Sequence, residues 1–135
     1  MMYVTRQVKF SAGHRLHNPL LSDEENVSIF DKCNNPNGHG HNYILEVTLS
    51  GEINPSTGYV YDLKKLKTII YDEIVDKVDH KNLNTDVEFL KGINPTVENL
   101  AVAIWNLLAN KFDEAKLYKI KIFETDTSFV EYYGE

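Results

Sequence analysis

The period of the hydrophobic pattern changes twice along the chain, and this change most constrains the fold. Apolar and polar residues alternate from Met2 to Phe10 and again from His41 to about Ile53, which is the pattern of half-buried strands. Near the other end, residues 116–124 and 128–133 alternate again around a short polar turn and predict a β-hairpin. Four strands are therefore expected.

Between these two pairs of strands, apolar residues recur every three to four positions and predict two helices. The first follows Asp62, a suitable N-cap, and ends near Asp79. The second is capped either by Asn94 or by Thr96. This order predicts an α+β fold with a four-stranded antiparallel sheet and two helices on one of its faces.

The bulk properties predict one cytoplasmic domain over residues 1–135. No apolar run reaches the length of a membrane span, and the first residues alternate rather than form a signal peptide. The net charge of −6, without a basic cluster, argues against nucleic-acid and membrane-surface partners. Residues 13–38 are rich in Asn, Asp, Ser and Gly and are expected to form a long functional loop.

Three histidines are candidate metal ligands. His39 and His41 are two residues apart, so both rings point to one face of an extended chain. If the first two strands pair as antiparallel neighbours, His14 approaches them. Three imidazoles without a fourth protein ligand are typical of a catalytic zinc site. Any one of these histidines alone would more often be a polar residue at a loop or strand end. His17 is a minority option for a fourth ligand.

The other candidate catalytic residues are Cys33, Asp79 and His80. A thiol that acts as a general base needs its pKa lowered by a cation, and the polar loop around Cys33 favours a chemical role over burial. Asp79 can orient the imidazole of His80, but a histidine is also favoured at a helix C-terminus by the dipole. The local sequence leaves both interpretations open.

Glu124 ends the apolar row of a strand, where a carboxylate is costly unless it is paired. Its two oxygens can accept two N–H groups from a guanidine-like edge of a heterocycle. The competing interpretation is an ion pair with Arg6, which also lies in an apolar row.

With these residues assembled, the chain resembles the 6-pyruvoyltetrahydropterin synthase family almost from end to end. The segments that carry the resemblance, in family order, are "FSAGHRL", "LSDEEN", "CNNPNGHGHNY", "GEINPSTG", "YDLKKL", "DHKNL", "PTVENLAVAIW" and "LYKIKIFETD". The resemblance implies the tunnelling fold, in which three subunits join their sheets into a twelve-stranded barrel and two trimers form a homohexamer. It also implies conversion of 7,8-dihydroneopterin triphosphate to 6-pyruvoyltetrahydropterin, a lyase step of tetrahydrobiopterin biosynthesis.

The resemblance also implies roles for individual residues. By this resemblance the zinc ligands are His14, His39 and His41, and the general base is Cys33. Asp79 and His80 are the proton-relay partners, provided by a neighbouring subunit. Glu124 is the pterin anchor and Thr96 a further pterin contact. For the triphosphate, the cations Arg15, Lys32 and Lys81 are our hypothesis. The resemblance leaves open whether Mg²⁺ assists triphosphate departure.

Four alternative functions remain at this point. Sequences of 6-carboxytetrahydropterin synthase type carry three residues between the cysteine and "HGH", whereas five separate Cys33 from His39 here, which favours the pyruvoyl enzyme over that relative. Relatives that cleave the pterin side chain carry Glu at the cysteine position. A non-catalytic zinc-binding or pterin-binding protein, or a zinc hydrolase, explains the histidines but gives Cys33 no purpose.

Overall fold

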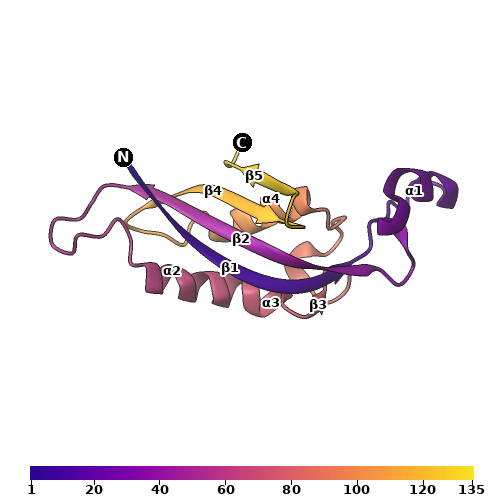
Figure 1. The fold of residues 1–135 in the computed structure, drawn as a ribbon, viewed down its shortest axis with the longest axis horizontal. Coiled ribbons are helices and arrows are strands. Elements are labelled where there is room, and N and C mark those ends of the chain that lie inside the picture. Colours follow the sequence, from indigo (N-terminus) through magenta and orange to yellow (C-terminus); the bar gives the residue numbers. More distant parts are fainter.

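Two long antiparallel strands form the centre of the fold. In the computed structural model, which describes residues 1–135, β1 (Met2–His14) pairs with β2 (His39–Gly51) along its whole length (Figure 1). β4 (Lys116–Phe123) then pairs with β2, but only from Ser50 to Ile44. Residues 10–14 and 39–43 therefore extend beyond β4 as a two-stranded segment, which we call the β1–β2 ribbon.

The predicted sheet of four antiparallel strands is wrong in one respect, because the sheet has five strands and is mixed. The order is β3-β1-β2-β4-β5, with β5 (Phe129–Tyr132) antiparallel to β4 at one edge. The additional strand, β3 (Lys81–Asn82), runs parallel to β1 beside Ala12 and Gly13. Two residues have no detectable hydrophobic period, so the sequence pattern gave no signal for β3.

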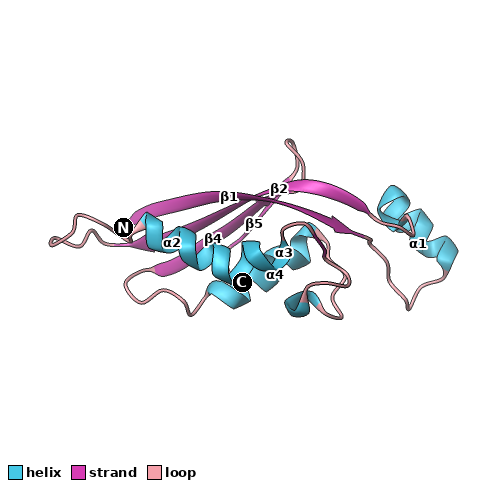
Figure 2. Ribbon diagram, turned by 90° about the horizontal axis from the view of Figure 1, so that it is seen from below, coloured by secondary structure: helices cyan, strands magenta, loops and turns pink.

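Two helices cover one face of the sheet and leave the other face open (Figure 2). The first is a continuous helix made of α2 (Leu63–Ile70), a π-helical turn η2 (Tyr71–Val75) and α3 (Asp76–Val78). The second is α4 (Val97–Leu108). Both helices were predicted. The hydroxyl of Thr96 accepts the N–H of Asn99 at 3.1 Å, so the cap is Thr96 and not Asn94.

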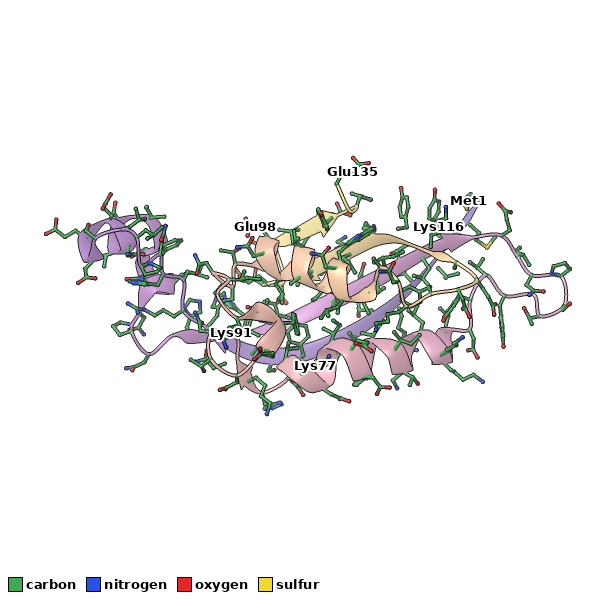
Figure 3. All side chains as sticks on the ribbon, turned by 180° about the vertical axis from the view of Figure 1, so that it is seen from behind. Met1, Lys77, Lys91, Glu98, Lys116 and Glu135 are labelled. Carbon is green, nitrogen blue, oxygen red and sulfur yellow. The ribbon has the colours of Figure 1, made fainter.

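The core lies between these helices and the sheet, where side chains from both layers fill the space (Figure 3). The strand periods predicted from the sequence put Leu45 and Val47 of β2 into this core, and the helical period does the same for Leu66 and Ile70. This packing fixes which face of each strand is buried, and hence which face of the ribbon carries the histidines. No helix of the protein is both long and apolar enough to cross a membrane.

The segment 13–38 is not the continuous loop that was expected. It contains α1 (Asp23–Phe30) and a 3-10 turn, η1 (Asp31–Asn34), both at the ribbon end of the molecule and apart from the other helices (Figure 1). Ser22 and Glu25 form a capping box, each side chain bonding the other residue's backbone N–H. The sequence signal for this helix was the spacing of these two residues, since Ser-x-x-Glu is typical of a helix start. One further 3-10 turn, η3 (Glu88–Leu90), precedes α4.

Candidate functional site

Three histidines converge on the helix-facing side of the β1–β2 ribbon. The strand register sets His14 opposite His39 and sets His41 opposite Ala12. One possible ligand atom from each of the three imidazoles lies within 4.8 Å of the others, and the rings meet edge-on. Nitrogens about 2.1 Å from one tetrahedral metal ion are about 3.4 Å apart, so the cluster is close to a metal-binding arrangement.

The surroundings of His14 fit a metal ligand. The ring is buried, and the carbonyl oxygen of Pro95 lies 2.8 Å from its Nδ1. Because a carbonyl can only accept, Nδ1 carries the proton and Nε2 keeps its lone pair. That Nε2 is buried and has no hydrogen-bond partner in the protein. A buried acceptor without a partner is costly, and a backbone carbonyl on the other ring nitrogen is the usual second contact of a ligating histidine.

His39 and His41 complete the cluster with half-buried rings. Their Nε2 atoms lie 3.0 Å apart and therefore point at the same region of space. Burial lowers the pKa of His41, as it does for His14, so the neutral imidazole is favoured at both positions. Neutral imidazole is the form that binds metal ions.

Gly38 brings the start of β2 close to the end of β1. Its φ of +73° lies in the left-handed region, and a Cβ there would meet the carbonyl oxygen of His14 at 2.8 Å. The backbone can thus turn directly from the preceding loop into His39. A side chain at this position would push the two ligand-bearing strands apart.

Cys33 is held near the end of β1 by backbone contacts. Its carbonyl oxygen accepts the N–H of Leu16 at 2.7 Å, and the amide of Asn34 donates to the carbonyl of Leu16 at 2.8 Å. Burial raises the pKa of the Cys33 thiol, and the carboxylates of Glu124 and Asp31 raise it further. This direction is opposite to the one expected for a general base, and a nearby cation would counteract it.

Glu124 acts electrostatically on the same group of side chains. It lies half-buried immediately after β4, on the side of the sheet that carries Ile120 and Ile122, as its spacing predicted. Its charge raises the pKa of Cys33 and, after burial, is the next cause of the raised pKa of Tyr43. It also opposes the lowering of the pKa values of the buried histidines.

The alternative ion pair between Glu124 and Arg6 is not formed. Arg6 lies opposite Val47, whereas the residue before Glu124 pairs with Ile44, and neither Arg6 nor Glu124 takes part in a salt bridge. Glu124 therefore keeps its carboxylate available for a ligand.

Asp79 and His80 do not join the histidine cluster within one chain. They lie along the outer edge of β1, where the carboxylate of Asp79 accepts the N–H of Ser11 at 2.9 Å and contacts Nδ1 of His80 at 3.1 Å. The bond from Ser11 lowers the pKa of Asp79. The side chain of His80 is 81% exposed and the residue has a φ of +60°. The predicted Asp–His contact is present, but neither residue belongs to the group formed by the three histidines.

His17 is not part of the cluster, so the option of a fourth ligand is not supported. Its Nδ1 lies 3.0 Å from the amide nitrogen of Asn34 and therefore accepts a hydrogen bond.

Two residues that touch the cluster were not singled out in the sequence, namely Tyr43 and Pro95. Tyr43 is buried and its hydroxyl lies 3.4 Å from Nδ1 of His14. Its alternation with His41 could have indicated this, whereas a contact made by the Pro95 carbonyl has no sequence signal.

A comparison with models of known protein families identifies the chain. The model described as 6-pyruvoyl tetrahydropterin synthase matches residues 3–135. The chain belongs to this family.

Individual members of the 6-pyruvoyl tetrahydropterin synthase family are similar over nearly their full length. A protein from Homo sapiens named 6-pyruvoyl tetrahydrobiopterin synthase is 50% identical over 132 residues, covering 98% of this chain and 91% of the human protein. The protein of the same name from Poecilia reticulata is 50% identical over 133 residues, covering 98% and 90%. The solved structure of Caenorhabditis elegans 6-pyruvoyl tetrahydropterin synthase superposes with a TM-score of 0.93 at 46% identity, covering 99% of this chain and 96% of that one. The α+β fold described above is thus that of the family.

Proposed function

We propose that the protein converts 7,8-dihydroneopterin triphosphate to 6-pyruvoyltetrahydropterin and triphosphate, as a lyase of tetrahydrobiopterin biosynthesis, and that residues 1–135 form one domain for this reaction. Family membership and about half-identity to proteins named for this synthase activity support the proposal. The observation that carries it is the cluster of His14, His39 and His41 on the same face of the sheet as Glu124.

In this proposal His14, His39 and His41 hold one zinc ion. The buried and unpartnered Nε2 of His14 supports a metal there, and three nitrogen ligands without a fourth leave a position for substrate. Bound zinc supplies Lewis-acid polarisation of substrate oxygens and so acidifies the neighbouring C–H bonds. The chain's own part is to keep three neutral imidazoles in register.

Cys33, Glu124 and Thr96 act on the pterin from the same chain. The Cys33 thiolate accepts the proton from the substrate C–H bond. The Glu124 carboxylate, free of any ion pair, accepts two N–H groups of the pterin and fixes its orientation. Thr96 and the backbone at the start of α4 lie next to Pro95, whose carbonyl holds His14, so this segment can contact the ring beside the metal.

Asp79 and His80 serve the site of a neighbouring subunit, where the imidazole moves protons and the carboxylate orients it. The exposure of His80 and its separation from its own histidine cluster support this arrangement. Both edges of the sheet also support assembly, because β5 is a free edge and β3 covers β1 only at Ala12 and Gly13. We propose trimers with a continuous barrel, paired into a hexamer.

The experiment is turnover of 7,8-dihydroneopterin triphosphate by the zinc-loaded protein, with products identified by mass spectrometry. Three proteins are compared: wild type, Cys33→Ala, and Asn37→Ala as a control at an exposed position of the same loop. We expect wild type and Asn37→Ala to yield 6-pyruvoyltetrahydropterin, and Cys33→Ala to keep its zinc and lose the product. A carboxylated or side-chain-cleaved pterin from wild type would assign the sister activities instead. Full activity of Cys33→Ala would remove the thiol from the mechanism.

A further inference from the structure

The β1–β2 ribbon contains a polar hollow on the side to which Ser11 and Asn42 point, and His41 of the histidine cluster also borders it. The hollow has a volume of about 340 Å³, which is within the range of ligand pockets. Its lining residues are Ser11, Ala12, Gly13, Gly40, His41, Asn42, His80 and Lys81. None of the roles proposed above uses Ser11, Gly40 or Asn42, and Lys81 is one of the three cations considered for the triphosphate.

Two glycines form the floor of this hollow. Gly13 and Gly40 are direct partners in the strand register, and neither has a positive φ. A Cβ at Gly40 would find its nearest neighbour, the carbonyl oxygen of Ala12, at 3.6 Å, which is an ordinary contact. The fold of the chain therefore does not require glycine at position 40. A glycine inside a strand lowers stability and often marks a place where a ligand approaches the backbone closely.

The rim of the hollow presents hydrogen-bond donors and a positive charge. Lys81 contributes an exposed ammonium group beside the floor. The hydroxyl of Ser11 bonds the side-chain oxygen of Asn42 at 2.7 Å, which leaves the Asn42 NH₂ group free to donate. The Nδ1 of His80 is directed at Asp79, which leaves Nε2 for the hollow. No carboxylate is part of the lining, although Asp79 contacts Ser11 and His80 beside it, and the donors together with the ammonium group fit an oxyanion.

We propose that this hollow is a phosphate subsite, and that it binds the triphosphate group of a substrate held in the active site of a neighbouring copy. The second half of this statement rests on the proposed function. Strand alternation directs the side chains of Ser11 and Asn42 to the face opposite that of His14 and His39, and His41 borders the hollow at its edge. Lys81 directly follows His80, so the copy that lends His80 to its neighbour also lends Lys81.

The position of the subsite indicates which of the three cations considered for the triphosphate, Arg15, Lys32 and Lys81, contacts the phosphates. The Nε of Arg15 donates to the carbonyl of Asn34 at 3.1 Å, on the segment that carries Cys33. Lys32 lies in η1, on the segment that carries Cys33. Lys81 lines this hollow, which has no carboxylate in its lining, and also a second one that contains Asp86 and Glu88; it is assigned the main contact with the phosphates.

The test uses inorganic tripolyphosphate as the probe, measured by titration calorimetry on the zinc-loaded protein. We expect Lys81→Met to weaken binding at least about tenfold, because a charge-assisted contact is lost. Gly40→Ala places a methyl group in the floor and should also weaken binding while zinc content is unchanged. Lys67→Met removes the same charge from an exposed position on α2 and should bind like wild type.

Kinetics then separate this inference from the proposed function. Lys81→Met should raise the KM for the triphosphate substrate. Mixed oligomers of Lys81→Met and Cys33→Ala chains should be more active at low substrate concentration than oligomers of Lys81→Met alone. In some of their sites the Lys81→Met chain provides Cys33 and the neighbouring Cys33→Ala chain provides Lys81. No gain on mixing would overturn the assignment to a neighbouring copy, and unweakened tripolyphosphate binding by Lys81→Met would overturn the subsite itself. If wild type fails to convert the pterin but still binds tripolyphosphate through Lys81, the proposed function is wrong and the subsite stands.

Discussion

Replacing Gly38 with alanine should damage the metal site through the backbone, without touching any ligand. The substitution has two costs. Gly38 has a φ of +73°, which an L-residue reaches at a cost of about 1–2 kcal/mol. In addition, its new Cβ would lie 2.8 Å from the carbonyl oxygen of His14, which belongs to the backbone and cannot rotate away.

Gly58 provides a matched control for the first of these costs. Gly58 has a φ of +77°, and a Cβ added there would have no atom within 4 Å. Gly58→Ala should therefore lower the free energy of unfolding by only about 1–2 kcal/mol. Overpacking typically adds about 1–3 kcal/mol, so Gly38→Ala should lower it by about 2–5 kcal/mol.

The assay is urea unfolding of both variants at one protein concentration, together with zinc content. We expect Gly38→Ala to lose more stability than Gly58→Ala and to bind zinc more weakly, because the two ligand-bearing strands must separate. Equal stability losses in the two variants, with equal zinc content, would refute the idea that close contact at Gly38 sets the geometry of the cluster.

Three further predictions follow from local contacts. Thr96→Ala should destabilise the protein by about 1 kcal/mol in urea unfolding, because the cap of α4 is lost; an unchanged midpoint would contradict this. Leu45→Ala should cost about 2–5 kcal/mol in the same assay, since Leu45 is fully buried, and a cost below 1 kcal/mol would contradict the core packing. The N–H of Ser11 lowers the pKa of Asp79 from 3.8, so Asp79 stabilises the fold above that pH and loses this effect as the pH falls through the lowered value. The stability difference between wild type and Asp79→Asn should therefore shrink on acidification below pH 3.8, and a difference that grows would contradict the assignment.

The histidine cluster could be predicted because strand geometry is nearly independent of the rest of the fold. Alternation places His39 and His41 on one face, and antiparallel pairing brings the end of one strand to the start of the next. The same parity argument placed Glu124 beyond Ile122 on that face. These predictions needed only the two-residue alternation of side chains along a strand and the antiparallel pairing of β1 with β2.

Other features depended on contacts that carry no period. β3 consists of two residues aligned by Ser11 and Gly13, which bond the backbone N–H groups of His80 and Leu83. The π-helical turn in the first long helix adds one residue to a pattern that looked regular. α1 was missed for a different reason: its capping box is visible in the sequence, but exposed apolar residues such as Val27 give it no clear apolar stripe.

The electrostatics of Cys33 could not be inferred from its neighbours in the chain. Its loop contains Lys32, which suggests a lowered pKa, yet burial and the distant Glu124 act in the opposite direction. Spatial proximity to Glu124 arises from the sheet and not from the local sequence. Asp79 and His80 likewise lie outside the group of three histidines within one chain, and nothing in the local sequence indicated this.

The central claim is that the three histidines hold the zinc on which turnover depends, and a zinc titration of metal-free protein tests it most directly. We expect turnover of 7,8-dihydroneopterin triphosphate to rise in proportion to bound zinc and to saturate at about one ion per chain. We also expect His41→Ala to bind little zinc and to stay inactive across the titration, because one of the three ligands is gone. Full turnover by metal-free protein, or zinc binding by His41→Ala equal to that of wild type, would contradict the central claim.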